Sequence, residues 1–536
     1  MGERDGSIFV PYGGPTGWER GRSDMKRPWA LLCLLTCFAA HAATVQIRIH
    51  EDRPGPTISR NLYGQFMEHL GRGVYDGVWV GPESPIPNHD GFRTDVLAAL
   101  KALHIPVIRW PGGCFADEYH WRDGIGPRGE RPVTINTNWG GVEETNAFGT
   151  HEFLELTEML GADAYIAGNV GTGSPREMAE WLEYMTSDAG SSLARLRRTN
   201  GRDQPWHVAY WGIGNEAWGC GGNMRPEYYA DLYRRFAAFL KAPGGTPPQK
   251  IASGGHDALT DWTEELSRID SDIDGISHHY YTLPTGNWDH KGSATEFGED
   301  EWISTLSRTL RIDDYIRRQE DVLDKNDPDG RIGLYIDEWG TWYDPDPAAP
   351  SSPLYQQNTL RDAVVAALNF HVFHRHAARV RMANIAQTVN VLQAMILTSD
   401  KRIVLTPTYH AFELYVPFQD ATYLPLTADG IPQYRYAGYA VPALSATAAR
   451  GKDGKLHIGL INVDPHTDID VVITLDDARL SGGTARILTG SQMNSRNTFD
   501  VPNAVEPKPF ARIGLRAGAL NVTLPAKSIV VIETNL

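Results

Sequence analysis

Three features that would point to common binding functions are missing from this chain of 536 residues. It has no run of basic residues and a formal net charge of −16, which argues against nucleic acid as a partner. No phosphate loop or dinucleotide fingerprint lies between a strand-like and a helix-like segment, so we expect no cofactor. The apolar stretch Trp29–Ala40 is too short to span a bilayer, so no membrane is expected around the mature protein.

Cysteine is also scarce, with four residues in the whole chain. Only Cys114 and Cys220 follow the N-terminal segment, and two cysteines do not make a disulfide framework. Both follow predicted strands at one face of the fold, and an exported protein could pair them. Two free thiols are the simpler prediction, and a bridge is the alternative.

The N-terminal segment has the order of a secretory signal. A basic start at Met25–Arg27 precedes the apolar run, and Ala40–Ala42 matches a small-residue cleavage site. These residues predict an exported protein, periplasmic or extracellular, cut after Ala42. Residues 1–24 are polar and glycine-rich, which suggests Met25 as the true start. A lipoprotein anchor on Cys37 is the weaker alternative, because the residue before it fits poorly.

From about residue 60 to 417, short apolar segments alternate with amphipathic helical patterns. Apolar residues recur at i, i+3, i+4 and i+7 in stretches such as Phe92–Leu103, Phe153–Leu160 and Tyr229–Leu240, the signature of one buried helix face. Alternating strands and helices predict a parallel (β/α)8 TIM barrel in the α/β class. The eight expected strands are Leu62–Glu68, Val107–Trp110, Ala164–Gly168, Trp211–Asn215, Ile251–Gly254, Gly275–His279, Gly333–Asp337 and Met382–Ile385.

After residue 418 the helical period stops and short β-rich runs follow, separated by turn clusters. This spacing predicts a C-terminal all-β sandwich over 418–536, and the strand-like residues 43–59 are expected to join it. The expected strands are Gln433–Tyr439, Ala443–Ala448, Leu456–Val463, Ile469–Leu475, Ala485–Leu488, Ala511–Leu515 and Ile529–Glu533.

Two of the expected barrel strands end on glutamates. Glu216 closes the fourth strand and Glu338 the seventh, so both belong to the carboxyl rim where barrel enzymes place their chemistry. Paired carboxylates suit glycoside hydrolysis, in which one acts as acid/base and the other as nucleophile. The alternative is a pair of structural ion-pair glutamates.

Several neighbours of this pair are candidate sugar contacts. Asn215 could donate to a sugar hydroxyl, and Tyr280 could hold Glu338 through its own hydroxyl, unless it is a buried tyrosine bonded elsewhere. Glu68 ends the first strand and could bind hydroxyls or pair with a rim arginine. In Arg109–Cys114 two glycines allow close backbone approach to a ligand, although a tight structural turn explains them equally well.

Two aromatic or amide side chains complete the set. Gln387 follows the eighth strand and could read a hydroxyl, and Trp139 could stack on a sugar or cap the core. His371, His374 and His376 look like a possible metal cluster, but on a helix the third points away from the others. We therefore predict no metal site.

Together these segments resemble the α-L-arabinofuranosidases of glycoside hydrolase family 51. The likeness covers nearly the whole chain from about Thr44 to the C-terminus, and its specificity lies in the combination. The segments that carry it are Arg109–Tyr119, Trp121–Pro127, Asn138–Asn146, Trp211–Gly222, Asp337–Trp339 and Ala383–Gln393.

The resemblance implies a retaining, exo-acting hydrolase that releases terminal α-L-arabinofuranosyl residues from arabinan, arabinoxylan or their oligosaccharides. It gives Glu216 the acid/base role and Glu338 the nucleophile role. It also implies a homo-oligomer, often a hexamer. The implied sugar contacts are Glu68, Cys114, Asn215, Tyr280 and Gln387, with Trp139 near the entrance.

Two other interpretations remain open from the sequence. One is another barrel glycosidase, an endo-glucanase, a xylanase or a β-xylosidase. The second is a carbohydrate-binding protein without catalysis, which the two rim glutamates argue against.

Overall fold

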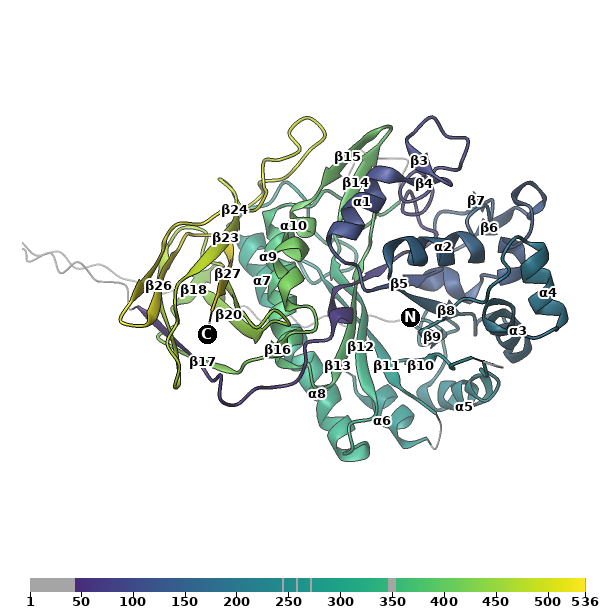
Figure 1. The fold of residues 1–536 in the computed structure, drawn as a ribbon, viewed down its shortest axis with the longest axis horizontal. Helices are drawn as coiled ribbons and strands as arrows, with labels where there is room; N and C mark the ends of the chain where they lie inside the picture. Colours follow the sequence, from purple (N-terminus) through teal and green to yellow (C-terminus); the bar gives the residue numbers. More distant parts are fainter. Residues whose placement is uncertain (1–43, 243–244, 257–258, 270–271, 346–352, 536) are drawn as a thin grey trace, which may run out of the picture. The chain divides into compact units, whose positions relative to one another are not determined.

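A closed parallel barrel forms the centre of the fold (Figure 1). The computed structural model describes residues 44–242, 245–256, 259–269, 272–345 and 353–535. The strand order around the barrel is β10-β11-β12-β13-β2-β5-β8-β9, so each strand lies beside the next along the chain and the circle closes between β9 and β10. All eight predicted strands are confirmed: β2 Gly64–Phe66, β5 Val107–Trp110, β8 Asp163–Gly168, β9 Tyr210–Ile213, β10 Gln249–Ser253, β11 Gly275–Thr282, β12 Gly333–Thr341 and β13 Val380–Ala386.

Helices follow the strands, and most of them bury one face, whereas α9 and α10 are buried almost throughout. Ser174 caps α3 through its hydroxyl, and prolines occupy the first turn of α3 and α5, where a missing N–H costs nothing. The helices are α1 Thr94–Ala102, α2 Thr150–Leu160, α3 Pro175–Thr186, α4 Ser192–Thr199, α5 Pro226–Ala237, α6 Asp261–Arg268, α7 Glu299–Thr309, α8 Arg311–Asn326, α9 Leu360–Arg375 and α10 Pro407–Tyr415. Short 3-10 turns lie at η1 Arg60–Tyr63, η2 Cys114–Asp117, η3 Trp121–Gly124, η4 Arg128–Glu130 and η5 Val416–Phe418.

Strands β11 and β12 run further toward the carboxyl rim than the sequence suggested. Their register shifts between Ser277 and His279, so that His279 lies opposite Glu338 while Ser277 lies opposite Tyr335. The extra residue on β12 is a β-bulge, which re-aims side chains and is frequent beside active sites. Asp337 and Glu338, although adjacent, therefore both reach side chains of β11.

The C-terminal strands form two sheets, as predicted, and the purple N-terminal strand β1 (Val45–Ile49) joins one of them (Figure 1). β1 runs parallel to β22 and antiparallel to β17. One sheet has the order β17-β1-β22-β26-β25 and the other β16-β20-β21-β27-β23-β24. Their bounds are β16 Thr422–Tyr423, β17 Leu426–Asp429, β20 Leu444–Arg450, β21 Leu456–Asn462, β22 Ile469–Leu475, β23 Gly483–Thr489, β24 Lys508–Pro509, β25 Ile513–Arg516, β26 Ala519–Leu524 and β27 Ser528–Thr534.

The single strand predicted at Gln433–Tyr439 is wrong. The residues form the hairpin β18 (Gln433–Tyr436) and β19 (Tyr439–Pro442), because Ala437 and Gly438 both take positive φ and reverse the chain in two residues. Other hairpins are β3 Asn88–His89 with β4 Phe92–Arg93, β6 Thr134–Asn136 with β7 Val142–Glu144, and β14 Ile396–Ser399 with β15 Arg402–Leu405.

Helix α9 joins the barrel to the sandwich, and nearly all of its residues are buried. His371 bonds to the hydroxyls of Ser445 and Tyr415, and His374 bonds to the hydroxyl of Thr447 and to that of Tyr63. No metal site was predicted at these two histidines. Their ring nitrogens bond to hydroxyls on both sides of the contact between the barrel and the sandwich. Burial lowers the pKa of His374 to about 3, so it packs there as a neutral ring.

The predicted signal, residues 25–42, lies outside the described residues. Among the described residues, no helix combines the length and apolar character needed to cross a bilayer. We propose 60–417 and 418–536 as the limits of barrel and sandwich, since η5 ends at Phe418 and the first sandwich strand begins at Thr422.

Candidate active site

Seven of the eight predicted site residues line one small pocket of about 60 Å³ at the carboxyl rim of the barrel. Their positions follow from the strands, since parallel barrel strands bring their carboxyl ends to one face. Tyr281, Trp342, Leu354 and Leu392 line the same pocket and were not predicted. The seven predicted residues are Glu68, Cys114, Trp139, Asn215, Glu216, Glu338 and Gln387.

Glu338 lies within β12 and is almost fully buried, with 6% of its surface exposed. Its Oε1 accepts a hydrogen bond from Arg109 Nη1 at 2.7 Å, and its Oε2 accepts one from the Tyr281 hydroxyl at 2.8 Å. Burial and the negative charge of Glu338 raise the pKa of Tyr281 well above its ordinary value, so the phenol remains a donor. Both oxygens are thus fixed in direction, and a positive charge compensates the carboxylate.

Glu216 follows β9 and has a positive φ of 40°, a left-handed conformation that is uncommon outside glycine. Such strain persists where the surroundings impose it, and it is concentrated at functional sites. A carboxylate oxygen of Glu216, one of Glu338 and a nitrogen of His279 all lie within 4.8 Å of one another. The barrel therefore brings the two glutamates together across 122 residues of sequence.

His279 links the two glutamates from the neighbouring strand. Its Nδ1 lies 2.7 Å from Glu216 Oε1 and 3.4 Å from Glu338 Oε2, and its Nε2 lies 3.5 Å from Asp337 Oδ1. Burial alone would lower the pKa of His279, but Glu338, Asp337 and Glu216 outweigh it and raise that pKa to about 10. His279 is therefore an imidazolium that donates from both nitrogens.

This protonation state argues against a metal at the cluster. Glu216, His279 and Glu338 are close enough to share an ion, but an imidazolium has no lone pair for a metal. A divalent ion would have to displace a proton that three carboxylates hold. The donor set fits proton and charge transfer between side chains better than it fits metal binding.

The Arg109 guanidinium connects Glu338, Asn215 and Asp337. Its Nη2 donates to Asn215 Oδ1 at 2.5 Å and its Nε lies 3.5 Å from Asp337, in addition to the bond to Glu338. Because Asn215 Oδ1 is used in this way, its amide NH₂ is the group left for the pocket. Buried Asp117 accepts from the backbone N–H of Asn215 and Val170 and so fixes the loop after β9.

Glu68 and Gln387 form the opposite wall. Glu68 Oε1 accepts from the backbone N–H of Gly113 and Phe115, and Gln387 Nε2 donates to Glu68 Oε2 at 3.3 Å. Burial, together with the charge of Glu338, raises the pKa of Glu68 to about 7. Gln387 Oε1 is buried and has no hydrogen-bond partner among the described residues, which makes it a ready acceptor for a sugar hydroxyl.

The two glycines in the Arg109–Cys114 segment lie directly against carboxylates of the site. A Cβ on Gly113 would lie 2.7 Å from Glu338 Oε1, and one on Gly112 would lie 2.6 Å from Glu68 Cγ. Any side chain at either position would push a carboxylate out of place.

The prediction that Tyr280 holds Glu338 is wrong. The Tyr280 hydroxyl donates to the backbone oxygen of Arg308, and Tyr281 takes the predicted role. Side chains alternate along a strand, so Tyr281 shares a face with His279 while Tyr280 points to the other side. The alternation of Ser277, His279 and Tyr281 was the sequence signal that could have identified both missed residues.

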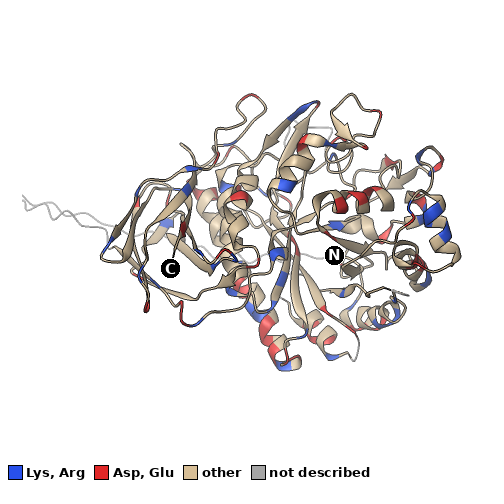
Figure 2. Cartoon of the chain, viewed as in Figure 1, with Lys and Arg blue, Asp and Glu red and all other residues tan. Residues whose placement is uncertain are grey.

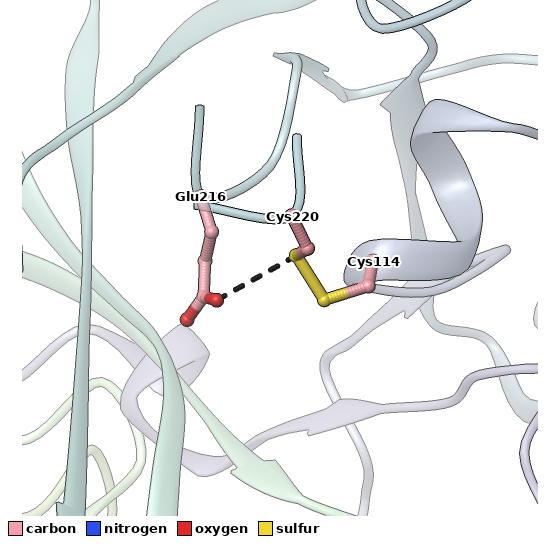
Figure 3. Close-up of side chains that lie close together, drawn as sticks. All are labelled: Cys114, Glu216 and Cys220. Atoms are coloured by element: carbon pink, nitrogen blue, oxygen red, sulfur yellow. Dashed lines mark hydrogen bonds between the residues drawn. A yellow bond between two sulfur atoms is a disulfide. The ribbon is translucent and has the colours of Figure 1, made fainter. Parts of the chain in front are cut away.

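The prediction of free thiols is also wrong, because Cys114 and Cys220 form a disulfide (Figure 3). It ties the loop after β5 to the loop after β9, which carries Glu216. Glu216 Oε2 lies 3.7 Å from Cys220 Sγ, along the dashed line in Figure 3. The bridge was the alternative that the sequence left open, because both cysteines follow predicted strands at one face of the barrel.

A second, larger cavity of about 740 Å³ begins at the same glutamate. Glu216, Tyr281 and Trp342 line both cavities and so mark their boundary. Glu216 therefore lies between a small pocket and a much larger groove.

Two models of α-L-arabinofuranosidase domains match different parts of this chain. Residues 99–297 match the α-L-arabinofuranosidase 1 domain, and residues 337–528 match the α-L-arabinofuranosidase C-terminal domain. An intracellular exo-α-L-arabinofuranosidase of Bacteroides ovatus is 50% identical over 94% of this chain and 99% of its own length. 

Solved structures give the same result. The GH51 arabinofuranosidase from Xanthomonas axonopodis pv. citri is 53% identical, with a TM-score of 0.90 over 92% of this chain and all of that one. The arabinose complex of α-L-arabinofuranosidase from Thermotoga maritima is 31% identical, with a TM-score of 0.81 over 92% of this chain and all of that one.

The comparison with the Bacteroides ovatus relative contradicts the predicted export, since that protein is named as intracellular. A basic pair, a short apolar run and a small-residue triplet are a weak pattern, because each is common by chance near a chain start. The prediction of a secreted or periplasmic protein is therefore withdrawn.

Proposed function

The chain belongs to the α-L-arabinofuranosidases of glycoside hydrolase family 51, and we propose that Glu338 and Glu216 carry out its reaction as nucleophile and acid/base. It is an exo-acting, retaining α-L-arabinofuranosidase. The separation of the two carboxylates carries the proposal. Retaining enzymes hold their carboxyl groups about 5–5.5 Å apart, inverting enzymes farther, and oxygens of Glu216 and Glu338 lie within 4.8 Å.

In the first step, the terminal arabinofuranosyl ring occupies the small pocket, with its anomeric carbon against Glu338. Glu338 attacks this carbon while Glu216, which pairs as a carboxylate with His279 in the free enzyme and takes up a proton in the complex with substrate, donates that proton to the glycosidic oxygen. The bond from the anomeric carbon to the leaving oxygen breaks, and the ester to Glu338 forms. Arg109 and Tyr281 hold the attacking carboxylate in line.

In the second step, water enters from the groove side as the leaving group departs. Glu216, now ionised, takes a proton from that water, which attacks the anomeric carbon and displaces Glu338. Two inversions give net retention. The position of Glu216 at the boundary of the two cavities supports both parts of its role, since the glycosidic oxygen and the incoming water occupy that boundary in turn.

For the sugar contacts we propose Glu68, Cys114, Trp139, Asn215 and Gln387, which line the pocket. The amide NH₂ of Asn215, which lies 3.8 Å from the weak acceptor Cys220 Sγ, and the unpartnered oxygen of Gln387 support hydroxyl recognition in the pocket. Tyr281 replaces Tyr280 in this set.

Removal of the nucleophile tests the proposal. Glu338→Ala should lower kcat on an aryl α-L-arabinofuranoside by more than about 10³-fold, because the proposed ester forms on this carboxylate. Glu227→Ala is a matched control, since Glu227 is exposed on α5 and remote from the pocket. Activity of Glu338→Ala near that of the control would refute the assignment.

The acid role predicts a dependence on the leaving group. Glu216→Ala should lose about 10²- to 10⁴-fold on an arabinofuranosyl oligosaccharide, whose departing oxygen needs a proton. An aryl glycoside with an acidic phenol needs little help and should lose far less in the first step. Equal losses on both substrates, compared as kcat/KM, would contradict an acid role.

We further propose, from the family resemblance, that the natural substrates are arabinan, arabinoxylan or their oligosaccharides. The same resemblance leads us to propose a homo-oligomer, with the hexamer as the form to test. Release of arabinose from each polysaccharide tests the first. Light scattering at six times the chain mass would support the hexamer, and a monomer mass would exclude it.

A further inference from the structure

The open groove beyond Glu216 takes whatever is attached to the arabinofuranosyl unit. It is about 740 Å³ in volume, against about 60 Å³ for the pocket, so the structure gives far more room to the leaving group than to the sugar that is released. This assignment of sides rests on the proposed roles of Glu216 and Glu338. The chemistry of the groove walls then indicates which leaving group fits.

Aromatic rings line the groove near its mouth. Trp342 meets Trp288 edge to face with centroids 5.4 Å apart, and Trp218 lies 4.6 Å from the ring of His256. Trp288 is 55% exposed, an unusual state for so large an apolar side chain. Flat, accessible rings of this kind can cover the apolar faces of pyranose units. The groove is therefore suited to a saccharide chain.

Two arginines add a positive charge to the same groove. Arg308 donates through Nε and Nη2 to the backbone oxygens of Pro284 and Thr285, while its Nη1 lies against Gly286, another lining residue. Arg311 begins α8 and is exposed. Among the described residues, no carboxylate lies within 4.0 Å of either guanidinium.

The carboxylates of the groove are already engaged elsewhere. Asp314 pairs with Arg317 and with Arg318 on α8, where blue and red residues alternate (Figure 2). Glu216 bonds to His279, which is itself positively charged. The positive charges of Arg308 and Arg311 are thus left uncompensated within the groove.

We propose that this groove recognises an acidic leaving group, a saccharide chain that carries a uronic acid residue, with Arg311 and Arg308 binding its carboxylate. A guanidinium is weakly hydrated and pairs with carboxylates in a two-pronged geometry. The backbone bonds of Arg308 fix its plane in advance, which lowers the entropic cost of binding. The tryptophans of the groove cover the neutral sugar rings, and the arginines favour chains that carry a carboxylate.

A pair of matched substrates tests the proposal. One is an arabinofuranosylated xylo-oligosaccharide with a uronic acid on its backbone, and the other is the same compound after reduction of the carboxyl to an alcohol. The wild type should show a kcat/KM about two- to fivefold higher on the acid, mainly through KM, the size expected of a partly exposed ion pair. The preference should shrink as ionic strength rises, because the contact is partly exposed.

Variants at Arg311 locate the effect. Arg311→Gln should lose most of the preference for the acid, and Arg311→Lys should keep part of it. Lys325→Gln removes an equal charge from the exposed face of α8 outside the groove and should leave the preference unchanged. Equal kcat/KM on the two substrates, or a preference that Arg311→Gln preserves, would overturn the proposal.

A third substrate separates this proposal from the catalytic one. An aryl α-L-arabinofuranoside has no saccharide leaving group, so its hydrolysis by the wild type depends on the pocket alone. No hydrolysis of it by folded protein would refute the proposed catalytic roles. Hydrolysis of it without a preference for the acid would refute only the recognition of uronic acid.

Discussion

At the scale of single residues, the site is a balanced set of charges around two glutamates. Arg109 and the His279 imidazolium offset Asp337, Glu216 and Glu338, and each positive group bonds to more than one carboxylate. The two glutamates could be predicted from the sequence, because each follows a short apolar run that marks the end of a strand. His279 was missed, although the alternation of Ser277, His279 and Tyr281 along the expected strand placed that side chain on the face of the site.

The charge of His279 predicts a pH dependence of stability. Its folded pKa of about 10 exceeds an unfolded value of about 6.5. A raised pKa contributes stability that is fully present below pH 6.5 and is lost as the pH rises through 10. The difference in unfolding free energy between wild type and His279→Gln should therefore shrink from pH 6.5 to 10 in denaturant titrations.

The exposed His104 gives a control, since His104→Gln should match the wild type across this range. A difference between wild type and His279→Gln that is constant with pH would show that His279 is not charged in the fold.

At the scale of elements, the barrel strands were predictable and their exact extent was not. Short apolar runs identified all eight, because the barrel strands are largely buried on both faces. The bulge in β12 and the added length of β11 depend on pairing between strands, which local sequence does not encode.

The disulfide between two rim loops belongs to this scale as well. It closes a loop of 106 residues, and loss of such a bond typically costs about 2–4 kcal/mol. Cys220→Ser should lower the unfolding free energy by that amount, and a dithiol reductant should lower that of the wild type similarly. Cys114→Ser provides the matched variant, and all three should coincide.

The reductant should have no further effect on either cysteine variant. If the denaturation midpoint of the wild type is the same with and without the reductant, the disulfide between the two loops does not stabilise the fold.

At the scale of the whole molecule, barrel and sandwich share one core. α9 packs between them, and Trp302 of α7 is fully buried and donates its indole N–H to the backbone of Val463 in the sandwich. The change from helical to strand period predicted two domains. It could not predict their shared surface, because α9 and the sandwich lie far apart in sequence.

Trp302→Ala tests this shared core. The substitution should cost about 3–5 kcal/mol, the usual range for a buried tryptophan, and unfolding should be measured by both fluorescence and circular dichroism. Trp288→Ala is the control for stability, because Trp288 is 55% exposed. A loss of unfolding free energy below about 1 kcal/mol in Trp302→Ala would show that Trp302 contributes little to the stability of the shared core.

The covalent intermediate on Glu338 tests the central claim most directly. Glu216→Ala, mixed with an aryl α-L-arabinofuranoside that has a good leaving group, should form the ester quickly and hydrolyse it slowly. Peptide mass spectrometry after rapid quenching should then find the Glu338 peptide heavier by one arabinosyl group. An unmodified Glu338 peptide during turnover, or the sugar on another carboxylate, would contradict the account.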